Sequence, residues 1–208
     1  MNNNLIGNID TVHTDNNIII KSNKSIFYNS FYFQDFYDDK CVTSFIKGTE
    51  RLIRQSQEYD DYLSLMKTNY NILTYDNVLS HIGDVDATIE FHHYPFTLYE
   101  IVEAVMNHHF LHKENFTSFS LAKEIMELHF KQKIGFVPLS TTNHQLAHGE
   151  LLFISTKQVF GNWEEFAAMY DDGISANKKN YIKKIKDLSD KNFATDYKGI
   201  LNVSKKGV

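Results

Sequence analysis

The chain of 208 residues is 42% hydrophobic and 14% aromatic, so it can bury a sizeable core as one domain or as one domain with appendages. Its only cysteine, Cys41, excludes an internal disulfide and a zinc ribbon built from several cysteines. Given a net charge of −5, no run of 18 apolar residues and no basic-then-apolar leader at Met1, we expect a cytoplasmic protein without a membrane partner.

The N-terminal part of the chain is expected to combine strands with one helix. β-branched and aromatic residues on both sides of a polar turn at 22–25 predict a β-hairpin or meander within residues 10–37. Apolar residues at helical spacing predict a helix over residues 49–67. The polar segment 69–86 should be irregular, with a short helix around residues 75–80.

Strands and helices alternate in the prediction for the middle of the chain. In chain order, the pattern predicts a strand at 87–92, helices at 97–112 and 119–132, a strand at 135–139, a short helix stopped by Gly149, a strand at 151–154 and a helix at 163–170. The short helix has capping oxygens at Ser140, Thr141 and Thr142. Together, these elements predict a single α+β domain over residues 1–174.

The last segment, residues 175–208, differs from the rest in charge. It contains nine lysines and three aspartates, a net charge of +6, and it is predicted to be a basic helical C-terminal segment. Two interpretations stay open for it. The lysines form either an arm that follows a phosphate backbone or the solvated face of a helix.

Two groups of histidines are the most informative feature of the chain. His92 and His93 are adjacent at the end of a predicted strand, and His144 and His148 stand four residues apart in a predicted helix. Residues four apart on a helix point the same way, so His144 and His148 can bind one ion. Four imidazoles can hold a divalent metal with three nitrogens and leave one ring as a base, which indicates metal-dependent hydrolysis.

These residues resemble the HNH, or ββα-metal, endonucleases in the variant that carries a His-His pair and a terminal His-x-x-x-His. The resemblance covers residues 87–97 and 135–150, so residues 98–134 would be a helical insertion into an HNH-like core. It implies that His92, His144 and His148 are the metal ligands and that His93 is the general base. Segments 97–102 and 159–162 also resemble proteins of large bacteriophages.

The resemblance implies a phage-encoded endonuclease that hydrolyses DNA phosphodiester bonds with one divalent ion. Zn, Ni, Mn, Co and Mg are the candidates, and three imidazoles suit Mg least. DNA would then be the partner, in the host cytoplasm.

An alternative is a catalytically degenerate HNH-like module that binds metal and serves a phage assembly or regulatory complex, with a phage or host protein as partner. It is favoured because the asparagine that fixes the base in the family has no counterpart at 133–137, although Asn143 or Asn107 could replace it from another direction. A third interpretation has no metal, and the histidines pack or pair with Glu90.

The other histidines are interpreted as surface or core residues. His108 and His112 also stand four apart on a predicted helix, but no second cluster in the sequence completes a site around them. His129 is treated in the same way.

Overall fold

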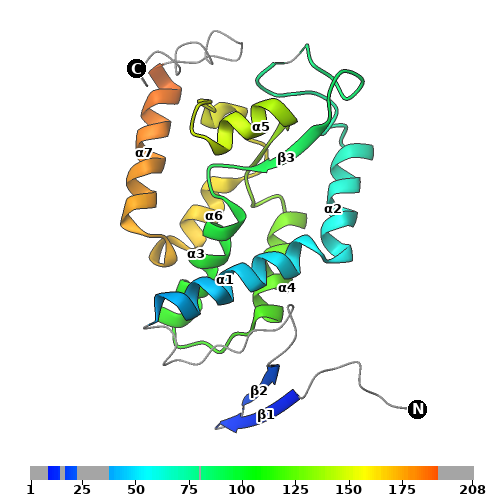
Figure 1. Ribbon diagram of the computed structural model, residues 1–208. Helices are drawn as coiled ribbons and strands as arrows, with labels where there is room; N and C mark the ends of the chain where they lie inside the picture. The colour runs from blue at the N-terminus through cyan, green and yellow to red at the C-terminus, as the bar shows by residue number, and fades with distance from the viewer. Residues whose placement is uncertain (1–8, 15–16, 23–37, 80, 192–208) are drawn as a thin grey trace, which may run out of the picture. The chain divides into compact units, whose positions relative to one another are not determined.

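The computed structural model describes residues 9–14, 17–22, 38–79 and 81–191, with side chains described from residue 38 onward. These residues form a mixed α+β fold, as the sequence predicts (Figure 1). They fall into two compact units. Unit 1 contains the chain up to Asp60, Leu98–Lys131 and Tyr170–Ile174, and unit 2 contains the rest. Among the described residues, no helix is long and apolar enough to cross a bilayer.

The N-terminal strands form an antiparallel pair. β1 (Ile9–Thr14) pairs with β2 (Asn17–Ser22), with Thr14 opposite Asn17. The strand predicted in the first half of the 10–37 segment is therefore confirmed as β2. The strand that pairs with it in the described residues is β1, which precedes it in the chain. The turn predicted at 22–25 and the aromatic strands beyond it lie outside the described residues, apart from Ser22.

The helix predicted at 49–67 is two helices, α1 (Asp39–Arg54) and α2 (Gln57–Thr68). α1 begins ten residues early because the Asp38 carboxylate caps it and accepts the backbone N–H groups of Lys40 and Cys41. The break follows from Ser56, whose hydroxyl donates to the Ile53 carbonyl and accepts the Tyr59 N–H. Neither proline nor glycine marks the break, so the sequence pattern did not reveal it.

Unit 1 is built on three helices that pack on one another: α1, α3 (Leu98–Leu111) and α4 (Ser118–Phe130). α3 and α4 confirm the helices predicted at 97–112 and 119–132. A reciprocal capping box between Thr117 and Ser120 starts α4. The short 3₁₀ turn η3 (Asp171–Gly173) lies against α3. The largest fully buried side chains of this unit are apolar: Phe45, Ile46, Ile53, Leu98, Ile101, Met106, Leu121 and Ile125.

Unit 2 is built around a second antiparallel pair, β3 (Ile89–His93) and β4 (Phe136–Ser140). The register places His92 opposite Val137 and His93 opposite Phe136. The elements that follow β4 are α5 (Thr141–His148), η2 (Thr156–Gln158), α6 (Trp163–Met169) and α7 (Ala176–Lys191).

The two faces of the β3–β4 pair are covered differently because side chains alternate along a strand. On one face, Val137 and Leu139 join a buried cluster against which Leu146 and Ala147 of α5 pack. On the other face, Phe91 stacks on Phe136 with ring centroids 4.2 Å apart. The face beneath α5 is the one that carries the histidine site.

Two predicted elements are absent from the described residues. The short helix expected around 75–80 is irregular chain, in which Tyr75 forms a single bridge with Gly83. The strand expected at 151–154 is also irregular, although Leu152 and Ile154 are buried in alternation as in a strand. These residues pack against the core without a strand beside them to complete a ladder.

The imidazole of His129 in α4 is fully buried in the core of unit 1. Its Nδ1–H donates to the Ile125 carbonyl at 2.8 Å, and its ring meets Tyr59 edge to face. Burial lowers the pKa of His129 to about 4, against the opposing effect of the Ile125 hydrogen bond, and Arg54 lowers it further. The folded state therefore holds this ring neutral while the unfolded chain binds a proton below about pH 6.5.

We predict that stability falls with acidity through His129. A group whose pKa is lowered by folding stabilises the protein fully above its unfolded value and loses that contribution as the pH falls from about 6.5 to about 4. Between pH 7.5 and pH 5, wild type should lose about 2 kcal/mol more free energy of unfolding than His129→Phe. Urea denaturation at the two pH values measures the difference. His81→Gln, a change at an exposed histidine, should match wild type.

Candidate metal centre

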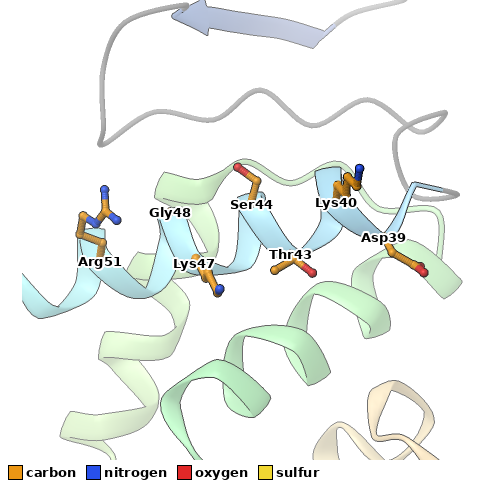
Figure 2. Close-up of a pocket in the computed structure, with 7 residues that line it drawn as sticks. All are labelled: Asp39, Lys40, Thr43, Ser44, Lys47, Gly48 and Arg51. Carbon is orange, nitrogen blue, oxygen red and sulfur yellow. The ribbon is translucent and has the colours of Figure 1, made fainter.

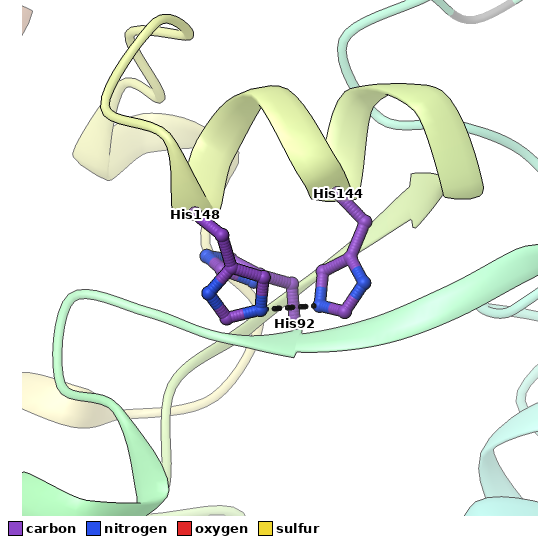
Figure 3. A group of neighbouring side chains, drawn as sticks. All are labelled: His92, His144 and His148. Atoms are coloured by element: carbon purple, nitrogen blue, oxygen red, sulfur yellow. Dashed lines mark hydrogen bonds between the residues drawn. The ribbon is translucent and has the colours of Figure 1, made fainter.

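Three of the four predicted site histidines converge in unit 2. His92 lies on β3, and His144 and His148 project from one side of α5 toward it (Figure 3). One nitrogen from each of the three rings lies within 4.8 Å of the chosen nitrogens of the other two. The helix forms as predicted, because the Ser140 hydroxyl caps it at the Asn143 N–H and Gly149 follows its last residue.

The two α5 rings are already at ligand spacing. The Nε2 atoms of His144 and His148 are 3.1 Å apart. Two nitrogens bound to one tetrahedral metal at about 2.0 Å each lie about 3.3 Å apart. The His92 ring centroid is 5.0 Å from that of each partner. The three nitrogens therefore need only small side-chain rotations to surround one ion.

Glu90 orients the ring of His144. His144 Nδ1 contacts Glu90 Oε2, and the Thr141 hydroxyl donates to the other carboxylate oxygen at 3.2 Å. An ionised carboxylate only accepts, so Nδ1 carries the proton and Nε2 presents its lone pair. This carboxylate–histidine arrangement is the outer-shell contact that commonly fixes a metal-binding imidazole.

Burial keeps His92 in the neutral form that binds metal. The side chain is only 7% exposed. Burial lowers the pKa of His92 to about 3, and the neighbouring imidazoles of His144 and His148 lower it further. The ring therefore holds an available lone pair throughout the neutral range.

The buried carboxylate of Asp76 anchors the start of α5. One oxygen accepts the Ser140 N–H at 2.7 Å and the Asn143 side-chain amide at 2.8 Å. The other oxygen accepts the N–H groups of Val78 and Leu79, both at 2.8 Å. Sequence reasoning missed Asp76 because it stands 64 residues before Ser140 in a segment without a motif.

His93 lies apart from the other three histidines. Neighbouring strand residues point to opposite faces, so His93 lies on the face away from α5, where its ring meets Phe91 at 4.9 Å. It is 6% exposed. The two proposed replacements for the missing asparagine are engaged elsewhere, since Asn143 donates to Asp76 and Asn107 donates to the Gly173 carbonyl. The role of His93 as a general base stays a prediction.

A hollow along α1 of unit 1 is a second place where charged residues gather (Figure 2). It measures about 580 Å³, and the described residues that line it are Asp39, Lys40, Thr43, Ser44, Lys47, Gly48 and Arg51. All of them belong to one helix, so no second described element contributes a group to a binding site there. Arg54, the other arginine of α1, pairs with Glu50 at 3.1 Å.

Comparison with known proteins identifies the class as a protein of the bacteriophage particle. A family model described as bacteriophage G278-like virion protein matches residues 1–206. Because the match spans nearly the whole sequence, the chain belongs to this family. The searches of the curated proteins and of the solved structures gave no match.

The family corrects the functional expectation. The sequence predicted a DNA endonuclease, but the matching family is one of virion proteins and no nuclease family is matched. The principal prediction is therefore wrong, and the non-enzymatic phage protein named as its alternative is favoured. The predicted phage origin is confirmed.

We predict that Asp76 is required for the integrity of this site. Asp76→Ala leaves four buried donors without their acceptor, at about 1–3 kcal/mol for each unpaired group before relaxation. The free energy of unfolding should fall by about 3 kcal/mol or more in urea denaturation. Asp84→Ala, an exposed change in the same loop, should cost less than about 0.5 kcal/mol. Equal midpoints for the two variants would show that the Asp76 contacts are dispensable.

Proposed function

We propose that this chain is a non-enzymatic virion protein whose β3–β4–α5 unit is a degenerate HNH-like core that binds one divalent metal as a structural centre. The observation that carries the proposal is the convergence of His92, His144 and His148 within 4.8 Å beneath α5. Membership of a virion-protein family supports a location in the phage particle, where other phage proteins would be its partners.

A metal at this position would hold α5 to the strand pair. Without an ion, the contact depends on the apolar packing of Leu146 and Ala147 on the strand face and on the Asp76 hydrogen bonds. α5 has only eight residues, which is too short for a helix to be stable by itself. An ion bound by residues of β3 and α5 would add a cross-link between the strand and the helix.

The donor set favours a borderline transition metal over magnesium. Three neutral imidazoles suit Zn and its neighbours, whereas Mg prefers oxygen ligands. Tetrahedral coordination by three residues leaves a fourth position, which water would fill. His148 is the exposed member of the trio, so that position would be open to solvent on its side.

The surroundings of His93 support a role without catalysis. A general base must reach the water that it activates. His93 is buried on the strand face opposite to His92, against an aromatic pair. This is the packing expected of a core residue, and it agrees with a structural protein.

The lysines of α7 also support a role without DNA cleavage. Lys186 pairs with Glu164 and lies over the Trp163 ring, 5.6 Å from its centroid. Lys178 lies over the Phe96 ring, 5.5 Å from its centroid. These contacts use two of the lysines to attach α7 to its own unit. Synthesis in the host cytoplasm, before assembly with other phage proteins, is part of the proposal.

We predict that metal stabilises the protein through the three histidines. Zn²⁺ at about 100 times its dissociation constant should add about 2.7 kcal/mol, which raises Tm by about 5–10 °C for a chain of this size. His148→Gln should abolish the part of the shift due to this site. Glu90→Gln, which keeps all three ligands, should weaken binding by about 10–100-fold. Differential scanning fluorimetry with Zn²⁺ and with EDTA gives both results, and an unchanged shift in His148→Gln would overturn the proposal.

We also predict that the metal-loaded protein leaves DNA intact. Supercoiled plasmid incubated with wild type and Zn²⁺, Ni²⁺ or Mn²⁺ should show no nicking above that given by His93→Ala. Bound metal is quantified in both proteins, so that a missing ion is not mistaken for missing catalysis. Nicking that depends on metal and disappears in His93→Ala would contradict the non-enzymatic role.

A further inference from the structure

A second cluster of metal-ligating side chains lies in unit 1. His108 and His112 come from α3 and the residue that follows it, and Asp172 comes from η3. The sequence showed the two histidines as an isolated pair, because their partner lies 60 residues further along the chain. The fold supplies the missing third group, so the expectation of a pair without a complete site is corrected.

The three groups are in direct contact. His108 Nδ1 lies 2.7 Å from Asp172 Oδ1, and His112 Nε2 lies 2.7 Å from Asp172 Oδ2. The two rings are adjacent, with centroids 4.4 Å apart, because the helical hydrogen bond from the His112 N–H to the His108 carbonyl continues past the end of α3. One carboxylate therefore bridges two imidazoles that share one helical face.

The backbone around Asp172 holds it firmly against α3. A β-carbon on Gly173 would lie 2.0 Å from the Ala104 carbonyl oxygen, so only glycine permits this approach. The Asn107 side-chain amide donates to the Gly173 carbonyl at 3.0 Å. On the other side, Tyr170 packs edge to face on His108 and donates to Glu124 at 2.7 Å. The third ligand is thus positioned before any ion arrives.

The adjacent His109 does not belong to this cluster. Its Nε2 lies 2.7 Å from Glu124 and its Nδ1 contacts Glu114, so both ring nitrogens are used by carboxylates. The carboxylates beside His109 raise its pKa against the opposing effect of its burial. This arrangement is that of a charged pair, and it leaves no nitrogen for a metal.

We propose that His108, His112 and Asp172 form a second divalent-metal site with two nitrogen ligands and one oxygen ligand. An ion at this site would be bound by His108 Nδ1, His112 Nε2 and one Asp172 oxygen. In a tetrahedral site with ligand distances of about 2.0 Å, ligand atoms stand about 3.3 Å apart. The 2.7 Å contacts must therefore open by about 0.6 Å, which rotation of the half-exposed His112 and Asp172 side chains allows.

Binding needs a change of tautomer and no other chemistry. In the hydrogen-bonded arrangement, each ring donates its N–H to the carboxylate. In the metal-bound arrangement, the same nitrogen presents a lone pair and the proton sits on the opposite ring nitrogen, reached by exchange with solvent. Zn²⁺ and its transition-metal neighbours suit this mixed donor set, and water would fill the remaining position.

Metal stoichiometry separates this site from the histidine trio of unit 2. Purified full-length protein is equilibrated with Zn²⁺, and bound zinc per chain is measured with four proteins: wild type, His112→Gln, His148→Gln and the double variant. We expect two zinc ions in wild type, one in each single variant and none in the double variant. His112 is exposed at a helix end, so His112→Gln should keep the fold, which circular dichroism verifies. His81→Gln, at another exposed histidine, should bind as wild type.

The four results also separate failure of this proposal from failure of the first. If only the unit 1 site exists, wild type binds one ion and His112→Gln none. If the unit 1 cluster is an ion pair alone, His112→Gln binds as many ions as wild type, and the proposal is overturned. Calorimetric titration of His148→Gln adds a second measure, because Asp172→Asn in that background should weaken zinc binding by more than about 100-fold.

Discussion

The buried carboxylate of Asp76 is the interaction on which the organisation of unit 2 depends. It is fully enclosed, and its two oxygens accept four donors from its own loop, from the end of β4 and from α5. A charge in the interior is costly unless it is paired or satisfied by hydrogen bonds. Here those bonds join three segments at one point, and α5 starts from that point in the orientation that brings His144 and His148 over His92.

The local elements of the site could be predicted from the sequence. Helical spacing related His144 to His148, Ser140 and Gly149 marked the ends of α5, and alternation along β3 separated His92 from His93. These inferences depend on short-range geometry, which residue spacing determines. The contribution of Glu90 was named only as a pairing partner, and its position two residues before His92 on the same strand face is what makes it an orienting group.

The parts that the sequence did not reveal depend on contacts between distant segments. Asp76 lies in irregular chain and Asp172 in the short η3 turn, and nothing in the sequence next to either residue distinguishes it from a solvated acid. The end of α1 was missed for a related reason, since Ser56 ends the helix through hydrogen bonds with Ile53 and Tyr59 that the residue type alone does not predict. The functional prediction went wrong because a histidine pattern specifies ligands better than it specifies a reaction.

The helical insertion has a consequence for the order in which the chain folds. β3 and β4 pair in register, yet 42 residues separate His93 from Phe136, and α3 and α4 occupy that interval. Closing so long a loop costs chain entropy before the strand contacts offset it. Because helices form from near neighbours, α3 and α4 can fold early and shorten the effective loop. We therefore expect the rate of folding to respond to the helices of unit 1, while the contacts of the strand pair mainly slow unfolding.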